Sequence, residues 1–201
     1  AAIFATPFLA ASAERIGLRS LVHRNSLNER YIRSSLQAMT MRPSRSRITV
    51  GYVSGTRTHD ADFREAEDAL IRVLQRHPEL ELRIFGLLEL SPKFDPVKDQ
   101  VKQVGLTSYY DMPKIISEFD INIAPLEQGN PYCRGKSEVK YLESAAVAVP
   151  TIASRSDSYI FAIANGSNGL LAGSTQEWFE NLETLISNHQ IRRRMGMRAR
   201  N

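Results

Sequence analysis

The segment from Gly129 to Glu143 holds the residues whose types and spacing are best suited to chemistry. A loop rich in Gly, Asn and Pro leads into a helix that we expect to open near Ser137. Free backbone N–H groups and the positive end of the helix dipole attract anions, and Lys136 directly precedes this helix start. Glu143 follows two turns inside the helix, and a carboxylate can accept hydrogen bonds from the two vicinal hydroxyls of a ribose. The segment therefore predicts a site for a phosphate group joined to a ribose.

Two other charged residues of this segment are consistent with either a binding or a structural role. Arg134 adds positive charge before the helix, and Lys140 stands one turn before Glu143. In a purely structural interpretation, Ser137 caps the helix, and Lys140 and Glu143 form a surface pair worth roughly a few tenths of a kcal/mol. Spacing alone leaves both interpretations open.

A second candidate site is the turn after the first strand of the predicted core. The residues that offer backbone donors, hydroxyls or positive charge there are Ser54, Gly55, Thr56, Arg57 and His59. Such a turn is a plausible cradle for an anion, although it has neither the spacing of a P-loop nor the Gly-x-Gly-x-x-Gly pattern. Taken alone, it is better interpreted as a loop in which Thr58, Asp60 or Asp62 caps the following helix.

Other chemistries have little support in the sequence. Cys133 is the only cysteine, which excludes a disulfide framework and a multi-cysteine zinc site, and no histidine pair has metal-ligand spacing. A Gly-x-Ser-x-Gly nucleophile turn is absent, and the acidic residues near the candidate sites form no identifiable acid–base pair. Trp178 and Phe179 fall on the apolar stripe of a helix, where we expect core residues. We therefore expect neither a metal nor a cofactor.

The elements that must position these residues alternate between strand and helix patterns. Strands are expected at residues 48–53, 80–85, 101–104, 121–125, 151–154 and 169–172. Helices are expected at residues 63–74, 112–119, 137–147, 176–187 and 191–200. This alternation predicts an α/β fold whose mostly parallel sheet carries helices on both faces. The functional crevice of such a sheet lies at the carboxyl ends of its strands, where both candidate sites fall.

Positive charge is concentrated at the two ends of the chain. Residues 1–48 carry eight Lys and Arg against two acids, and residues 191–201 carry five arginines and no acid. Residues 49–190 carry 13 basic and 20 acidic residues. Because the basic ends lack interleaved aromatic residues and any nucleic-acid module, we expect solvated or domain-facing surface there and no nucleic-acid partner.

The ends also differ from the middle in pattern. We divide the chain into the remnant of a neighbouring domain at 1–24, a linker at 25–47 and one complete α/β domain at 48–201.

No apolar run approaches the roughly 20 residues that cross a bilayer. Residues 1–13 are apolar but follow no basic segment, so they are a poor signal peptide. A single cysteine fits a reducing, cytoplasmic setting.

Several stretches combine into one pattern. Residues 136–143 read Lys-Ser-x-x-Lys-x-x-Glu, and residues 149–154 read Val-Pro-Thr-Ile-Ala-Ser. Residues 51–63 read Gly-Tyr-x-Ser-Gly-Thr-x-Thr-His-Asp-x-Asp-Phe, and residues 165–172 read Asn-Gly-x-x-Gly-Leu-Leu-Ala. In order and spacing these stretches resemble the donor-binding domain of the family 4 (group 1) retaining glycosyltransferases, over about residues 20–200.

The resemblance implies half of a GT-B fold, in which two Rossmann-like domains face each other across a cleft and the C-terminal one holds the nucleotide sugar. By this resemblance Glu143 binds the donor ribose, and Gly135 stands where the family has a glutamate that contacts the transferred sugar. Lys136 and Ser137 remain suited to the diphosphate. Gly86 would border the base.

The site residues follow from the motifs and the resemblance together. Those expected to act in transfer are Lys136 and Arg57. Those expected to bind the donor nucleotide are Ser54, Gly55, Thr56, His59, Gly86, Gly135, Ser137, Lys140 and Glu143. His59 and Arg57 would replace the phosphate-binding pair that the family carries after the first strand.

The sequence thus predicts a glycosyltransferase fragment that uses a nucleotide-diphosphate sugar and no metal. The expected acceptor is a glycan or lipid-linked glycan, as in polysaccharide biosynthesis, with retention at the transferred sugar. An N-terminal domain that the chain mostly lacks would be the partner, and the basic ends are compatible with peripheral contact to a membrane. Two alternatives stay open: a catalytically silent nucleotide-sugar-binding module, suggested by Gly135, and an α/β domain that docks a partner without any nucleotide.

Overall fold

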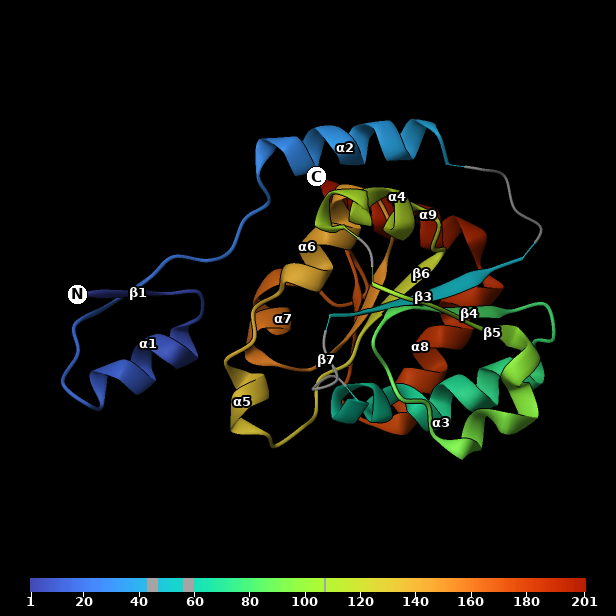
Figure 1. Ribbon diagram of the computed structural model, residues 1–201, viewed down its shortest axis with the longest axis horizontal. Coiled ribbons are helices and arrows are strands. Elements are labelled where there is room, and N and C mark those ends of the chain that lie inside the picture. The colour runs from blue at the N-terminus through green and yellow to red at the C-terminus, as the bar shows by residue number, and fades with distance from the viewer. Residues whose placement is uncertain (43–46, 56–59, 107) are drawn as a thin grey trace.

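The computed structural model of the chain describes residues 1–42, 47–55, 60–106 and 108–201. Its centre is a six-stranded sheet in the order β5-β4-β3-β6-β7-β8 (Figure 1). The strands are β3 (Thr49–Ser54), β4 (Glu81–Gly86), β5 (Val101–Val104), β6 (Ile121–Ala124), β7 (Thr151–Ser154) and β8 (Leu170–Ala172). Every neighbouring pair is parallel, so the predicted α/β fold with a parallel, Rossmann-like sheet is confirmed.

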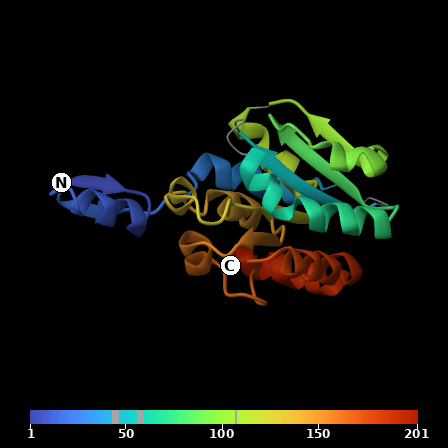
Figure 2. The same cartoon turned by 90° about the horizontal axis from the view of Figure 1, so that it is seen from below.

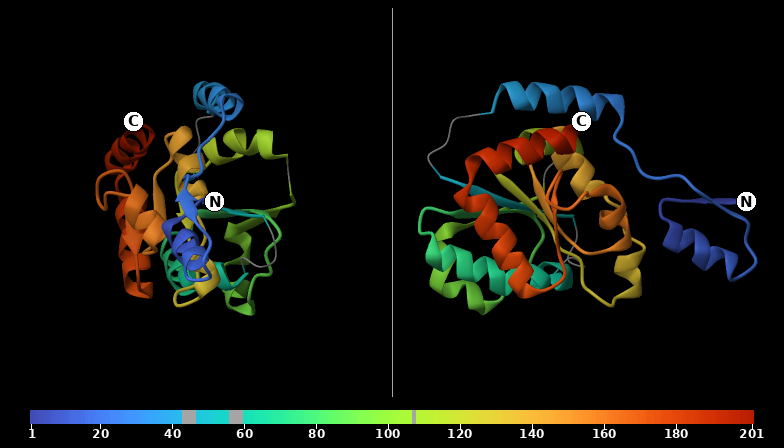
Figure 3. Two further views of the ribbon diagram at one scale, coloured as in Figure 1. Left: turned by 90° about the vertical axis from the view of Figure 1, so that its left-hand side faces the viewer. Right: turned by 180° about the vertical axis from the view of Figure 1, so that it is seen from behind.

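Helices cover both faces of this sheet (Figure 1). One face carries α3 (Asp60–Arg76) and α8 (Thr175–Ser187), which pack against each other. The other face carries α2 (Glu29–Thr40), α4 (Met112–Ser117) and α6 (Val139–Ala146). The last helix, α9 (His189–Arg200), contacts both α8 and α6 (Figure 3). Short helical segments complete the fold: η2 (Pro92–Gln100), η3 (Tyr109–Asp111), α5 (Pro131–Arg134) and α7 (Asp157–Ala162).

Burial explains why these residues form these elements. β6 and β7 are buried at every position, as expected for central strands covered on both faces. On α3 the apolar residues recur at helical spacing, and Leu70, Val73 and Leu74 are buried in the core beneath the sheet. Gly196 of α9 approaches the turn before β7 so closely that an added Cβ would lie 2.1 Å from the carbonyl oxygen of Ala148. That contact accounts for a glycine inside a helix.

The expected strands are present, and β5 and β7 have the expected bounds. The expected helices are also present, but α6 begins at Val139 instead of near Ser137. The short helices α5 and α7 and the segment η2 were not predicted, because elements of one or two turns show no clear period in the sequence.

The first 22 residues form a separate small unit (Figure 2). In it, β1 (Ala2–Phe4) and β2 (Ser20–Val22) pair in parallel, and α1 (Pro7–Glu14) connects them. The following range, expected as a linker, contains α2, whose Tyr31 is fully buried and packs on Tyr109 with 5.1 Å between ring centroids. Within the described part of the chain, no helix is both long enough and apolar enough to cross a membrane.

Candidate functional site

A cavity of about 220 Å³ opens where β3 and β4 end. Its lining residues are Val53, Ser54, Gly55, Phe85, Gly86, Leu106, Tyr109, Met112 and Glu143. Four of the predicted nucleotide-binding residues, Ser54, Gly55, Gly86 and Glu143, therefore meet at one place. The cavity combines a mostly apolar wall with one carboxylate, which suits a flat ring joined to a group that bears hydroxyls.

The carboxylate of Glu143 is held in a poorly solvated position on α6. Glu143 is 8% exposed, and burial raises its pKa to about 7, against the opposing effect of the Lys140 charge. Tyr31 and Tyr109 face it: burial first, and then the charge of Glu143, raise the pKa of both phenols. Both phenols are consequently neutral when Glu143 ionises, so they add no competing negative charge to this wall.

Gly86 closes the floor of the cavity. Its φ of +102° lies in the left-handed region, and an added Cβ would lie 1.7 Å from the carbonyl oxygen of Ser54. The hydroxyl of Ser54 donates to the carbonyl oxygen of Leu87 at 2.5 Å. The ends of β3 and β4 are thereby fixed against each other, and only glycine allows this approach.

Lys136 lies in the loop before α6, and it is not among the residues that line the cavity. Its ammonium nitrogen is 2.5 Å from Oδ2 of Asp62 and 5.2 Å from the ring centroid of Tyr132. The Lys136 side chain keeps 18% exposure, whereas the Asp62 side chain has 1%. Asp62 thus engages the ammonium of Lys136, while the Lys136 side chain as a whole keeps part of its surface accessible.

Lys140 stands on α6 between Lys136 and Glu143, and its ammonium nitrogen is buried. The nitrogen lies 4.3 Å from the ring centroid of Tyr52 and has no hydrogen-bond partner among the described residues. Burial lowers its pKa to about 8, although Asp62 and Glu143 act in the opposite direction. The structural interpretation of Lys140 and Glu143 as a surface pair is therefore wrong. A buried amine without a partner is costly unless something in the working protein interacts with it.

Two predicted residues, Gly135 and Ser137, do not line the cavity and contact the first 25 residues of the chain instead. The hydroxyl of Ser137 accepts a hydrogen bond from the amide of Asn25 at 2.7 Å, and no side chain caps α6, so the interpretation of Ser137 as the helix cap is wrong. The carbonyl of Gly135 accepts from the hydroxyl of Thr6 at 3.4 Å, and an added Cβ would lie 3.0 Å from Cδ2 of Leu9. A side chain at position 135 would therefore meet the N-terminal unit.

The remaining predicted positions divide into two groups. Thr56, Arg57 and His59 lie outside the described residues, and their roles stay predictions. Arg134 is 3.5 Å from Asp157 and stacks over Phe8, which places it at the contact with the N-terminal unit.

Three contributors to this region were missed by sequence reasoning. Asp62 is expected from the sequence as a helix cap, or as an acid near the crevice without an acid–base partner, yet it contacts Lys136. Arg24 donates to both oxygens of Glu138, the residue before α6, at 3.3 Å. Tyr31 belongs to the buried face of α2, whose spacing of Tyr31, Ser35 and Ala38 is a helical signal that the sequence does contain.

Metal and thiol chemistry find no site in the described part of the chain. No group of three or more His, Cys, Asp or Glu side chains there is arranged to hold a metal ion. Cys133 donates from its thiol to Oδ1 of Asp62 at 3.1 Å, and burial, followed by Asp62, raises the pKa of that thiol. The thiolate form is disfavoured, so Cys133 does not have the character of a nucleophile.

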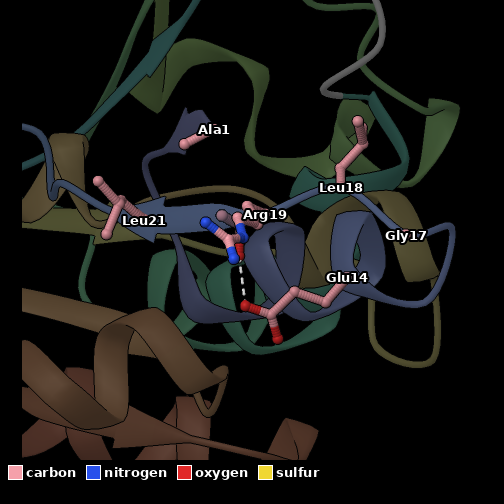
Figure 4. A pocket seen from close by; sticks show the side chains of 7 residues that line it. Ala1, Glu14, Gly17, Leu18, Arg19 and Leu21 are labelled. Atoms are coloured by element: carbon pink, nitrogen blue, oxygen red, sulfur yellow. Dashed lines mark hydrogen bonds between the residues drawn. The ribbon is translucent and has the colours of Figure 1, made fainter.

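A second hollow lies in the N-terminal unit (Figure 4). Ala1, Gly17, Leu18 and Leu21 are among its lining residues, and the hydroxyl of Ser20 donates to Glu14 at 2.6 Å. None of the predicted site residues lines this hollow. The predicted site residues that line a cavity therefore lie at the sheet.

Comparison with known proteins identifies the family of this chain. Residues 47–188 match the family described as Glycosyl transferases group 1. No curated protein matches the chain in sequence.

Solved structures share its fold. HepE from Anabaena, crystallised with UDP-glucose, is 18% identical with a TM-score of 0.70, and the match covers 98% of this chain and 57% of HepE. WaaG, a glycosyltransferase of lipopolysaccharide biosynthesis, is 13% identical with a TM-score of 0.73, covering 99% of this chain and 56% of WaaG. The C-terminal domain of LpcC from Francisella tularensis is 19% identical with a TM-score of 0.58, covering 86% of this chain and 90% of that domain. The chain thus spans little more than half the length of HepE and WaaG.

Proposed function

The chain belongs to the group 1 glycosyl transferases, and from this premise we propose that its six-stranded domain binds a nucleotide-diphosphate sugar as the glycosyl donor. The observation that carries the proposal is the placement of Glu143 in the cavity, with Lys140 and Lys136 beside it. The complex of HepE with UDP-glucose supports the same ligand class.

The three parts of such a donor match three parts of the site. The base fits the apolar wall formed by Leu106, Tyr109 and Met112. The ribose hydroxyls donate to Glu143, which accepts both when it is ionised. The diphosphate is then directed toward Lys140, Lys136 and the start of α6, where no side chain caps the helix.

In the proposed reaction, the bond between the anomeric carbon and the diphosphate oxygen breaks, and its electron pair leaves on that oxygen. An acceptor hydroxyl oxygen forms the new bond to the same carbon with retained configuration, and its proton is released. Lys136 and Lys140, with Arg57 and His59 as further candidates, favour the charge that develops on the departing nucleoside diphosphate. These residues supply the charge without a metal or an organic cofactor.

The acceptor that we propose is a glycan or a lipid-linked glycan, bound with the help of a second domain. The protein would act in the cytoplasm, with its basic ends as candidates for contact with an anionic membrane. A catalytically silent module that binds the nucleotide sugar is the second candidate, because Gly135 has no side chain and faces Leu9 of the N-terminal unit.

Calorimetric titration with UDP, ADP and GDP tests the binding step. We expect one of the three to bind, and Glu143→Ala to weaken that binding by about tenfold or more, because ribose hydrogen bonds to a charged group are lost. Glu180→Gln, an exposed carboxylate on α8, is the matched control and should leave the affinity unchanged. Failure of all three nucleotides to bind would favour a docking domain instead.

Transfer itself is tested in a longer form of the protein that includes a preceding domain. Release of nucleoside diphosphate from the sugar donor, abolished by Lys136→Ala, is expected for the enzyme. A silent module would bind the donor and release nothing.

A further inference from the structure

Asp62 is a buried carboxylate in the first turn of α3, and the sequence pattern gives it no role at the donor site. It is 1% exposed. Three donors from one stretch of chain converge on it: the backbone N–H of Glu127 at 3.0 Å, the thiol of Cys133 at 3.1 Å and the ammonium of Lys136 at 2.5 Å. These three donors lie 65 to 74 positions further along the chain, so Asp62 does more than cap its own helix.

These contacts join the two sides of the crevice. α3 follows β3, and the loop that holds Glu127, Cys133 and Lys136 follows β6, the neighbour of β3 on its other side. In parallel α/β sheets, ligands bind where successive crossovers leave in opposite directions, and this is that point in the strand order. Asp62 therefore fixes the loop that carries Lys136 against α3 at the edge of the proposed diphosphate position.

The charge of Asp62 also acts on Lys140. The ionisable groups that face the Lys140 ammonium are Asp62 from α3, Lys136 from the loop, Glu143 from α6 and Tyr52 from β3. Burial and Lys136 disfavour the charged form of Lys140, whereas Asp62 and Glu143 favour it. Of the two carboxylates, Asp62 has the larger effect on Lys140.

We propose that Asp62 is a positioning residue of the donor site: it holds Lys136 and its loop against α3, and it supplies the negative charge that lets two lysines stand close together. The proposal rests on the proposed binding of a nucleotide sugar. Asp62 itself does not touch the donor, because its side chain is enclosed by protein.

A competing interpretation predicts that removing Asp62 strengthens nucleotide binding instead of weakening it. If Asp62 merely competed with the diphosphate for Lys136, its removal would free a positive charge and strengthen nucleotide binding. The geometry argues against competition, since Asp62 is engaged by a backbone N–H and a thiol in addition to Lys136, and the Lys136 side chain keeps 18% exposure while it is bound to Asp62.

The first experiment measures binding of UDP and uridine, or of whichever diphosphate and nucleoside pair the unaltered chain prefers. Asp62→Asn should weaken diphosphate binding by about tenfold to a hundredfold, because Lys136 loses the charged group that holds it in place, and should leave nucleoside binding nearly unchanged. The matched control is Glu65→Gln on the same helix, since Glu65 accepts from the backbone N–H of Gln128 at 3.0 Å and bonds to no lysine among the described residues. It should bind both ligands as the unaltered chain does.

The second experiment separates a positioning role from a merely structural one. UDP binding should weaken at alkaline pH, where Lys140 loses its charge, and we call this part of the pH profile the alkaline limb. Because Asp62 favours the charged form of Lys140, Asp62→Asn should move this limb to lower pH. A loosened fold would reduce affinity at every pH without moving this limb. Lys140→Met should remove the limb altogether.

A double variant controls for the possibility that Asp62→Asn alone fails to fold. Asp62→Asn with Lys136→Met removes both members of a buried ion pair and avoids leaving one charge unpaired. If Asp62 acts through Lys136, the double variant should bind UDP no more weakly than Lys136→Met alone. Its loss of binding at alkaline pH should occur at lower pH than in Lys136→Met, because Asp62 favours the charged form of Lys140. Unchanged or strengthened UDP binding by Asp62→Asn, or additive losses in the double variant, would overturn the role of Asp62. Absence of any nucleotide binding by the unaltered chain would instead contradict the proposed function on which it rests.

Discussion

Glu143 and Lys140 show at the residue scale how burial prepares a site for a ligand. They lie one turn apart on α6, and burial brings the pKa of the acid up to about 7 and the pKa of the base down to about 8. Each is therefore easily converted between its neutral and charged forms near neutral pH. If binding of a nucleotide sugar needs an ionised Glu143 and a charged Lys140, its affinity should change with pH as each of the two groups titrates.

The affinity for a nucleotide sugar should accordingly pass through a maximum between about pH 7 and 8. Below this range Glu143 is protonated and loses an acceptor, and above it Lys140 is neutral and loses its attraction for phosphate. Titration calorimetry with UDP-glucose is the measurement, because the phosphates of a nucleotide sugar do not themselves titrate in this range. Glu143→Gln should abolish the acid limb only, and a profile identical to that of the unaltered chain would contradict the assignment.

Folding stability should also depend on Glu143. Since its folded-state pKa is raised, the neutral acid is favoured in the folded protein, and this stabilising effect is full below pH 4.5 and lost as pH rises through about 7. Glu143→Gln should therefore gain stability relative to the unaltered chain between pH 5 and 8, by roughly 2 kcal/mol. Urea unfolding at the two pH values measures this difference, with Glu180→Gln as the control that should show none.

At the element scale, the cavity exists because β3 and β4 end in close contact. Gly86 has φ of +102° and leaves no room for a Cβ beside the Ser54 carbonyl. Gly105, in contrast, has no atom within 4 Å of an added Cβ and no positive φ. Two glycines near the same sheet edge thus have different structural requirements.

Gly86→Ala should destabilise the protein by about 3 kcal/mol or more, because it combines a left-handed backbone with a steric clash against main chain. Gly105→Ala should change stability by less than about 1 kcal/mol, with a gain expected from the reduced freedom of the unfolded chain. Urea unfolding of both variants checks the contrast. Equal effects of the two substitutions would show that the close approach at Gly86 does not matter.

At the scale of the whole molecule, the segment before α2 ties the N-terminal residues to the site helix. Arg24 donates to both oxygens of Glu138, which is 3% exposed, and stacks over Phe161 at 3.5 Å. Asn25 donates to Ser137. The start of α6 is therefore held by residues more than 110 positions earlier in the chain.

Replacing Arg24 should reveal this link. Arg24→Gln leaves a buried carboxylate without its partner, which should cost about 3 kcal/mol of stability. Glu138→Gln combined with Arg24→Gln should recover most of that loss, because neither charge then remains buried alone. A double-mutant cycle by urea unfolding measures the coupling, and additive losses would show that the pair contributes nothing specific.

Periodicity and motif order in the sequence determined the strands, the main helices, the parallel α/β fold and the family. These features depend on residues close together in the chain, such as the alternation of buried strands with amphipathic helices. The rule that ligands bind at the carboxyl ends of parallel strands pointed to the ends of β3 and β4, and the family resemblance added Glu143 to the same donor site.

Only the tertiary structure decided what Lys140, Ser137, Gly135 and Asp62 do. Lys140 is buried beside Tyr52, Ser137 binds Asn25 instead of capping α6, Gly135 faces Leu9, and Asp62 holds Lys136 from 74 positions away. Each of these outcomes depends on a contact between segments far apart in the chain. Local spacing carries no information about which distant group will meet a given side chain, or how much water will remain around it.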